Sequence, residues 1–314
     1  MLRVRVITPS DTTPEVLERV RDDPTVANVV VLRGCAQDGG GDLVMFDLAR
    51  ENADPVLISL RELGVEDTGS IAFDEAETIL SHAAREAERA APGRPADGVI
   101  WETIEAQAHE DAGLSWSFVT FLVLATLIAG VGRYLDQPIL IIGAMVVGPE
   151  FAPVSAICFG LARRQWRLVP PAALSLVVGM GVAVMLAYLL WLGAWQGGLL
   201  DYRRATTGTV TQFIIKPDAW SLVIALLAGI AGTLSLTAAK SGTLVGVFIS
   251  VTTVPAVGTI ALTAAVGAWG EAASALAQLA INLAGLLIAG TCTLLVQQAI
   301  WRHVVVPRRT RASN

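Results

Sequence analysis

The chain divides by its hydrophobic pattern into two parts. Over residues 1–73, short apolar stretches alternate with charged positions, as in half-buried strands and amphipathic helices. From residue 114 onward, long apolar runs are separated only by short charged segments. Because about 20 apolar residues cross a bilayer, the second part predicts membrane spans. We therefore expect a soluble N-terminal domain followed by a polytopic α-helical membrane domain.

Residues 1–73 predict a small α+β domain. Helices are expected after Thr12-Thr13-Pro14, where proline suits a first turn, and over residues 55–63, which Gly64 ends. A glycine run, Gly39-Gly40-Gly41, predicts a hairpin turn. Strands are expected at 3–7, 28–32, 43–48 and 70–73. The order β-α-β-β-α-β is that of a ferredoxin-like unit, for which we expect a ligand-sensing or subunit-joining role.

Residues 74–113 predict a charged, amphipathic helical linker. One helix is expected over 74–91 and a second over 98–113, with Pro92-Gly93-Arg94-Pro95 between them. In the second helix, the spacing of Ile100 and Ile104 favours packing on a partner or on the bilayer surface.

Six apolar runs are long enough to cross a bilayer, which gives a membrane domain over 114–301 and a basic tail over 302–314. The runs are Leu114–Gly132, Gln137–Ala162, Leu168–Leu200, Ala219–Ala239, Ser241–Gly270 and Ala272–Trp301. Seven tryptophans lie near the ends of these runs, as in an interfacial aromatic belt: Trp116, Trp166, Trp191, Trp195, Trp220, Trp269 and Trp301.

The distribution of Lys and Arg predicts the orientation. Six spans place both termini on one side, together with Arg163, Arg164, Arg167, Lys240, Arg302, Arg308, Arg309 and Arg311. The opposite side carries Arg133, Arg203, Arg204 and Lys216. By the positive-inside rule, both termini are cytoplasmic. Since the first apolar run is too short for a signal peptide, we expect a multi-pass protein of the cytoplasmic (plasma) membrane.

Composition excludes several other classes of protein. Only 16% of residues are charged, against about 25% in soluble domains. The net charge of −6 argues against a nucleic-acid partner. The three cysteines are too scattered for a zinc site or a disulfide framework, and no metal or other cofactor is expected.

Two of the spans contain prolines near their middles. The second reads Gly143-Ala-Met-Val-Val-Gly148-Pro149-Glu150-Phe151-Ala152-Pro153, and the fifth contains Ser250-Val-Thr252-Thr253-Val254-Pro255. Proline removes a helical hydrogen bond, so we expect broken helices whose freed backbone groups face protein or water. A shift of roughly 102–104 positions lays the first three spans on the last three, and an odd number of spans per half implies an inverted repeat, as in many transporters.

Glu150 is the acid placed well inside a span, where a charge is costly and usually functional. One interpretation is a site for a proton, cation or small solute at Gly148, Pro149, Glu150, Pro153, Ser155, Ser250, Thr252, Thr253 and Pro255. The other is a shallow re-entrant loop that lets Glu150 reach water without any transport role. Lys240 and Asn282 are secondary candidates, with topological and helix-packing roles as their alternatives.

The two proline-bearing segments resemble those of the domain of unknown function 389 family, hydrophobic membrane proteins of bacteria and archaea. The resemblance covers roughly residues 115–300. This sequence departs from the family pattern at Glu150, where an apolar residue is usual, and at Ala256, where a second proline is frequent. The resemblance implies a membrane architecture and no particular activity.

Two functions remain open at this point. The first is a transporter or channel-like protein with its site between spans two and five, gated or held as a homo-oligomer by the N-terminal domain. The second is a non-transporting scaffold or sensor in which the N-terminal domain binds a ligand or partner. We do not expect an enzyme, because the spans contain neither His-Glu-x-x-His, nor Gly-x-Ser-x-Gly, nor a pair of acids.

Overall fold

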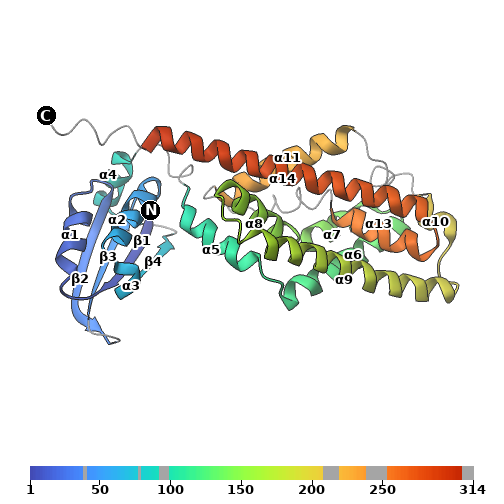
Figure 1. Ribbon diagram of the computed structural model, residues 1–314, viewed down its shortest axis with the longest axis horizontal. Helices are drawn as coiled ribbons and strands as arrows, with labels where there is room; N and C mark the ends of the chain where they lie inside the picture. The colour runs from blue at the N-terminus through green and yellow to red at the C-terminus, as the bar shows by residue number, and fades with distance from the viewer. Residues whose placement is uncertain (38–40, 77–78, 92–98, 208–218, 238–252, 306–314) are drawn as a thin grey trace. The chain divides into compact units, whose positions relative to one another are not determined.

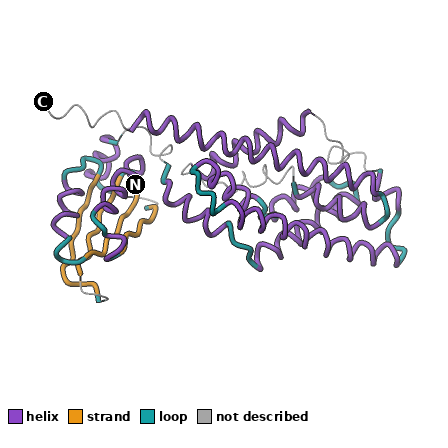
Figure 2. Tube along the Cα trace, viewed as in Figure 1, coloured by secondary structure: helices purple, strands orange, loops and turns teal. Residues whose placement is uncertain are grey.

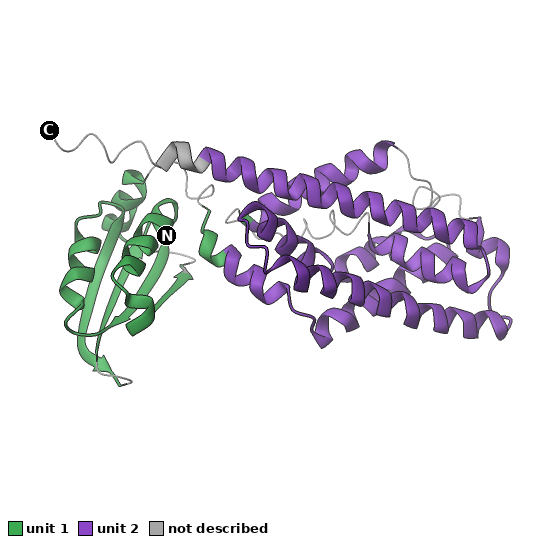
Figure 3. Cartoon of the chain, viewed as in Figure 1, with its two compact units in different colours: residues 1–103, 237–240, 303–314 green, residues 104–236, 241–302 purple. Residues whose placement is uncertain are grey.

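The computed structural model describes residues 1–37, 41–76, 79–91, 99–207, 219–237 and 253–305 (Figure 1). The chain forms two compact units, one built around Met1–Thr103 and the other comprising most of Ile104–Arg302 (Figure 3). Several predicted features lie outside the described residues: Gly39 and Gly40 of the hairpin turn, the Pro92–Pro95 breaker, and Lys240, Ser250 and Thr252.

The first unit is built on a four-stranded antiparallel sheet with strand order β2-β3-β1-β4 (Figure 2). The strands are β1 (Leu2–Thr8), β2 (Val26–Ala36), β3 (Gly41–Leu48) and β4 (Ser70–Glu75). Along β1, buried and exposed residues alternate strictly, since successive side chains point to opposite faces of a sheet. The four predicted strands are thereby confirmed.

Helices cover the face of the sheet that carries the core. Helix α1 (Thr13–Arg21) and helix α2 (Ala53–Glu62) bring apolar side chains such as Val16 and Leu60 against Val4 of β1. A 3-10 turn, η1 (Arg50–Asn52), precedes α2, and a single helical turn, α3 (Val65–Thr68), follows it. Gly64 separates α2 from α3 in the left-handed conformation (φ 71°), which glycine adopts without steric cost.

The predicted helix over 74–91 is wrong at its start. Asp74 and Glu75 belong to β4, and helix α4 (His82–Ala90) begins only after Ser81, whose hydroxyl accepts a hydrogen bond from the Ala84 N–H. Helix α4 packs against β2 and β3, so the first compact unit extends beyond residue 73.

Helix α5 (Trp101–Asp111) confirms the helix predicted over 98–113. The expectation for Ile100 is wrong, because this side chain is buried in the core of the first unit and does not face a partner or the bilayer. An isoleucine next to a helix can be buried in the core of its own domain or against a partner or the bilayer. The spacing of apolar residues does not tell these environments apart.

The second unit is a bundle of apolar helices. They are α6 (Trp116–Tyr134), α7 (Pro138–Val147), α8 (Phe151–Ala162), α9 (Val169–Gln196), α10 (Tyr202–Thr206), α11 (Ala219–Thr237), α13 (Val254–Ala265) and α14 (Trp269–Val305). In the described part of the chain, α6, α9, α11 and α14 are each long and apolar enough to cross a membrane, and the pair α7–α8 makes a fifth candidate if it counts as one span. The protein is therefore a multi-pass membrane protein, and its bilayer accounts for the large apolar side chains exposed on these helices, such as Val146, Leu174 and Leu227.

Glycine and alanine residues allow the helices of this bundle to approach one another closely. Helix α13 packs against α6, α7 and α9. A Cβ at Gly258 of α13 would lie 2.7 Å from the Cβ of Ala129 and 2.8 Å from the Thr126 carbonyl oxygen, both on α6. Helix α11 approaches α14 in the same manner at Gly229. Close backbone approach through glycine is the usual packing mode of membrane helices.

Candidate functional site

The second predicted span is interrupted between α7 and α8, as its prolines indicate. The axes of the two helices differ by 55°. Gly148 leaves the helical conformation (φ −67°, ψ 124°), and Glu150 is the N-cap residue of α8. Pro153 lies in the first turn of α8, where a backbone N–H has no partner within the helix, so the proline costs no hydrogen bond there.

The start of α13 meets this break. Thr253 is the N-cap residue of α13, and Pro255 lies in its first turn. The Thr253 hydroxyl Oγ1 donates a hydrogen bond of 2.6 Å to Oε1 of Glu150. Glu150 is 1% exposed and Thr253 is fully buried. The break between α7 and α8 and the start of α13 therefore share a buried polar contact.

Gly148 allows this close approach. A Cβ at this position would collide with a carboxylate oxygen of Glu150 and would lie 2.6 Å from Cγ2 of Val254. The missing side chain thus lets the end of α7, the Glu150 carboxylate and the first turn of α13 occupy one small volume.

The electrostatics of the contact favour a negative charge. The N-terminus of a helix carries a partial positive charge and unpaired N–H groups. Glu150 and Thr253 are the N-cap residues of α8 and α13 by position, without a side-chain capping hydrogen bond, and the Glu150 carboxylate accepts the Thr253 hydroxyl. The arrangement thus places one carboxylate at two helix N-termini, with a hydroxyl donor between them.

The remaining predicted residues lie apart from this contact or are not described. The Ser155 hydroxyl donates to the Ala152 carbonyl of its own helix at 2.7 Å. Asn282 is buried in α14, where its Oδ1 accepts a 3.2 Å hydrogen bond from Nε2 of Gln278. Thus only Glu150 and Thr253, among the predicted polar residues that the structure describes, are joined by a hydrogen bond.

Helices α8 and α13 occupy equivalent positions in the two halves of the second unit, separated by a constant number of residues. Helices α8 and α13 each have 12 residues, and their N-cap residues Glu150 and Thr253 are 103 positions apart. Their C-terminal turns match as well. The N–H of Gln165 donates to the Gly160 carbonyl (2.8 Å), and the N–H of Ala268 donates to the Thr263 carbonyl (2.9 Å). The residues with positive φ before these donors are Arg164 and Gly267.

Arg133 is a buried charge that the sequence did not reveal as such. The pattern places it beyond the first span, as a loop cation, but the structure puts it in the last turn of α6 with its side chain fully buried. Its Nη2 donates to the Thr206 carbonyl at 3.1 Å, and Glu271 and Asp136 act on it electrostatically.

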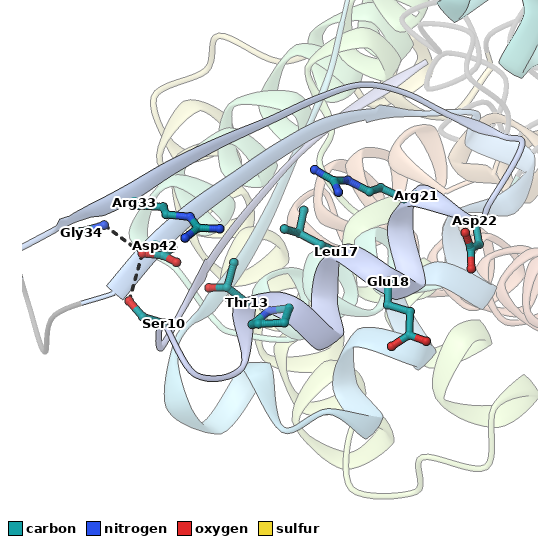
Figure 4. A pocket seen from close by; sticks show the side chains of 10 residues that line it. Ser10, Thr13, Leu17, Glu18, Arg21, Asp22, Arg33, Gly34 and Asp42 are labelled. Atoms are coloured by element: carbon teal, nitrogen blue, oxygen red, sulfur yellow. Dashed lines mark hydrogen bonds between the residues drawn. The ribbon is translucent and has the colours of Figure 1, made fainter.

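The first unit contains a pocket of about 650 Å³ between α1 and the β2–β3 hairpin (Figure 4). Asp42 lies at its floor, 3% exposed, and accepts hydrogen bonds from the Gly34 N–H (2.8 Å) and the Ser10 hydroxyl (3.0 Å). The Gly34 N–H holds the pKa of Asp42 below its ordinary value, with further help from the hydroxyls of Thr13 and Ser10 and the charge of Arg33. No pattern in the sequence indicates this pocket, because its residues come from three separate segments.

Comparisons with known proteins bear on the second unit. Residues 145–288 match the family model described as a domain of unknown function (DUF389). An uncharacterized protein of Methanocaldococcus jannaschii is 28% identical over 195 residues, which cover 60% of this chain and 58% of that protein. No solved structure matches the chain.

The matched region begins within α7 and ends within α14, so it contains both interrupted segments and their contact. These segments carried the resemblance noted in the sequence, and that resemblance is confirmed. Residues 145–288 of this chain are a DUF389 domain.

Proposed function

We propose that this protein is a membrane transporter or channel-like protein whose site is the contact between Glu150 and Thr253. The observation that carries the proposal is a buried carboxylate where the break between α7 and α8 meets the N-terminus of α13. An ionisable residue is costly within a membrane domain, and such residues usually serve an ion or substrate pathway. Paired broken helices at corresponding positions of two halves are a typical transporter site.

The common offset supports a 3+3 inverted repeat. Together with the span predicted over 241–270, the helices make six spans, three in each half. Helices α6 and α11 both have 19 residues, and their bounds differ by the same 103 positions that separate Glu150 from Thr253. Two residues in equivalent positions that contact each other lie at the symmetry axis relating the halves. The proposed site is therefore built equally by both.

The charge on Glu150 provides a mechanism. The ionised carboxylate holds the two helix N-termini together, because it accepts from Thr253 and lies at the positive end of both helices. A proton or a bound cation removes that charge and weakens the link. The halves then move apart and admit a small solute or ion from one side. In this scheme the described arrangement, with both side chains buried, is the closed state.

The test is flux in proteoliposomes made with the full chain. We expect uptake of a proton, cation or small solute that Glu150→Gln abolishes and Thr253→Val reduces. Ser155→Ala is the matched control, since that hydroxyl serves its own helix and flux should persist. If a broad panel of ions and solutes shows no flux that depends on Glu150, the proposal fails.

The second candidate is a non-transporting sensor or scaffold, and the pocket of the first unit favours it. The strand order β2-β3-β1-β4 and the β-α-β-β-α-β series are those of a ferredoxin-like domain. With both termini in the cytoplasm, such a domain would sample cytoplasmic ligands or join subunits of a homo-oligomer. Ligand or partner binding by a protein that shows no flux would support this function over the first.

A further inference from the structure

Two arginines of the first unit line its pocket, and neither forms an ion pair with an acid among the described residues. Arg21 comes from α1 and Arg33 from β2; in Figure 4 the Arg21 guanidinium lies above Leu17, and the Arg33 guanidinium lies on the Asp42 side of the pocket. Within the described residues, no carboxylate lies at ion-pair distance from either. By contrast, Arg3, Arg5, Arg19 and Arg61 of the same unit each pair with an acid.

Asp42 offsets part of the positive charge of Arg33, which in turn helps to lower the pKa of Asp42, but two arginines and one aspartate still leave this side of the pocket net positive. One of its oxygens already accepts from the Gly34 N–H and the Ser10 hydroxyl, which ties the hairpin to the loop before α1. Asp42 therefore organises the pocket and holds the backbone next to Arg33 in place. Glu18 and Asp22 also line the pocket, but in Figure 4 their carboxylates point away from the two guanidinium groups.

We propose that this pocket binds a small-molecule oxyanion, a carboxylate or a phosphate, between Arg33 and Arg21. A guanidinium presents a planar fork of donors that matches either group with two parallel hydrogen bonds. The rest of the ligand would lie against Leu17 and Pro14, which supply the apolar surface of the pocket. A volume of about 650 Å³ suits a small molecule. This site shares no residue with the Glu150 contact and does not depend on the transport proposal.

Isothermal titration of the full chain in detergent with pyrophosphate and with succinate tests the proposal. We expect saturable binding of at least one probe, and the probe that binds identifies phosphate or carboxylate as the recognised group. Arg33→Gln and Arg21→Gln should each weaken binding by about tenfold or more, because each removes charge-assisted hydrogen bonds. Arg33→Lys keeps the charge and loses the fork, so its affinity should fall between those of the wild type and Arg33→Gln.

Arg19→Gln is the matched control, since Arg19 lies on the same helix but pairs with Glu62. Its affinity should equal that of the wild type. Repeating the titration with the protein in phosphatidylglycerol nanodiscs distinguishes a free ligand from a lipid headgroup, because a headgroup in the pocket would suppress probe binding. Absence of saturable binding in detergent, or equal affinity in Arg33→Gln, Arg21→Gln and Arg19→Gln, overturns the proposal.

Discussion

Replacing Gly148 by alanine tests whether the interrupted segments meet as described. The new methyl group would collide with the Glu150 carboxylate and would lie 2.6 Å from Cγ2 of Val254. The backbone at Gly148 has φ −67°, which alanine adopts without strain, so packing alone decides the result. The carboxylate cannot simply swing aside without lengthening its hydrogen bond to Thr253. Overpacking of this kind costs about 1–3 kcal/mol.

Gly143→Ala is the matched control within the same helix pair. A Cβ there meets no atom within 4 Å, and the residue lies inside α7. Alanine in place of glycine inside a helix stabilises by about 0.5–1 kcal/mol, so the two substitutions should have opposite signs. The free energy of unfolding of the full chain, measured by SDS titration in mixed micelles with tryptophan fluorescence, provides the comparison.

A double-mutant cycle that combines Gly148→Ala with Val254→Ala tests whether positions 148 and 254 are in direct contact. Val254→Ala removes the methyl group that the new side chain would strike, so the double variant should be less destabilised than the sum of the single ones. Coupling between touching residues is about 0.5–3 kcal/mol. If Gly148→Ala is as stable as Gly143→Ala, or if the cycle shows no coupling, α13 does not approach the break as closely as we describe.

Further predictions concern other buried positions, and the same unfolding assay checks each. Gly258→Ala should lower the free energy of unfolding by about 1–3 kcal/mol, because the new methyl group would clash with backbone atoms of α6, which cannot rotate away as a side chain can. Arg133→Gln should destabilise by about 3–5 kcal/mol, since it removes a buried charge from its partners, and an unchanged stability would contradict the burial. Thr253→Val, which keeps the shape but removes the donor to the carboxylate, should cost about 1–3 kcal/mol. Burial raises the pKa of Glu51 above its ordinary 4.5, so stability is lost as pH rises through that raised pKa, and Glu51→Gln should be more stable than the wild type at pH 7 but not at pH 4.

Much of the fold was predictable because hydrophobic periodicity reports local structure directly. The four strands, the helix start at Thr13 and the break beside Pro149 all follow from patterns within a few residues. The helix start at 82 was missed, because charged residues continue the strand β4 without any change of composition.

The candidate site was only partly predictable. Glu150 is conspicuous as an acid within an apolar run, but four hydroxyl residues were equally plausible partners; of the two that the structure describes, Thr253 contacts Glu150 and Ser155 does not. The burial of Arg133 depends on a carbonyl at position 206, which no local pattern reveals. The pocket around Arg33 escaped for the same reason, since its walls come from distant segments.

The packing of α13 against α6 and α9 has a consequence for biogenesis. Helices α6 to α9 are synthesised well before residue 254. Until then, the surface of α6 that later receives Gly258 has no partner, and the Glu150 carboxylate has no hydroxyl donor from α13. The N-terminal helices of the second unit therefore lack part of their packing until α13 is made. Premature termination between the halves should yield a fragment that quality-control proteases remove.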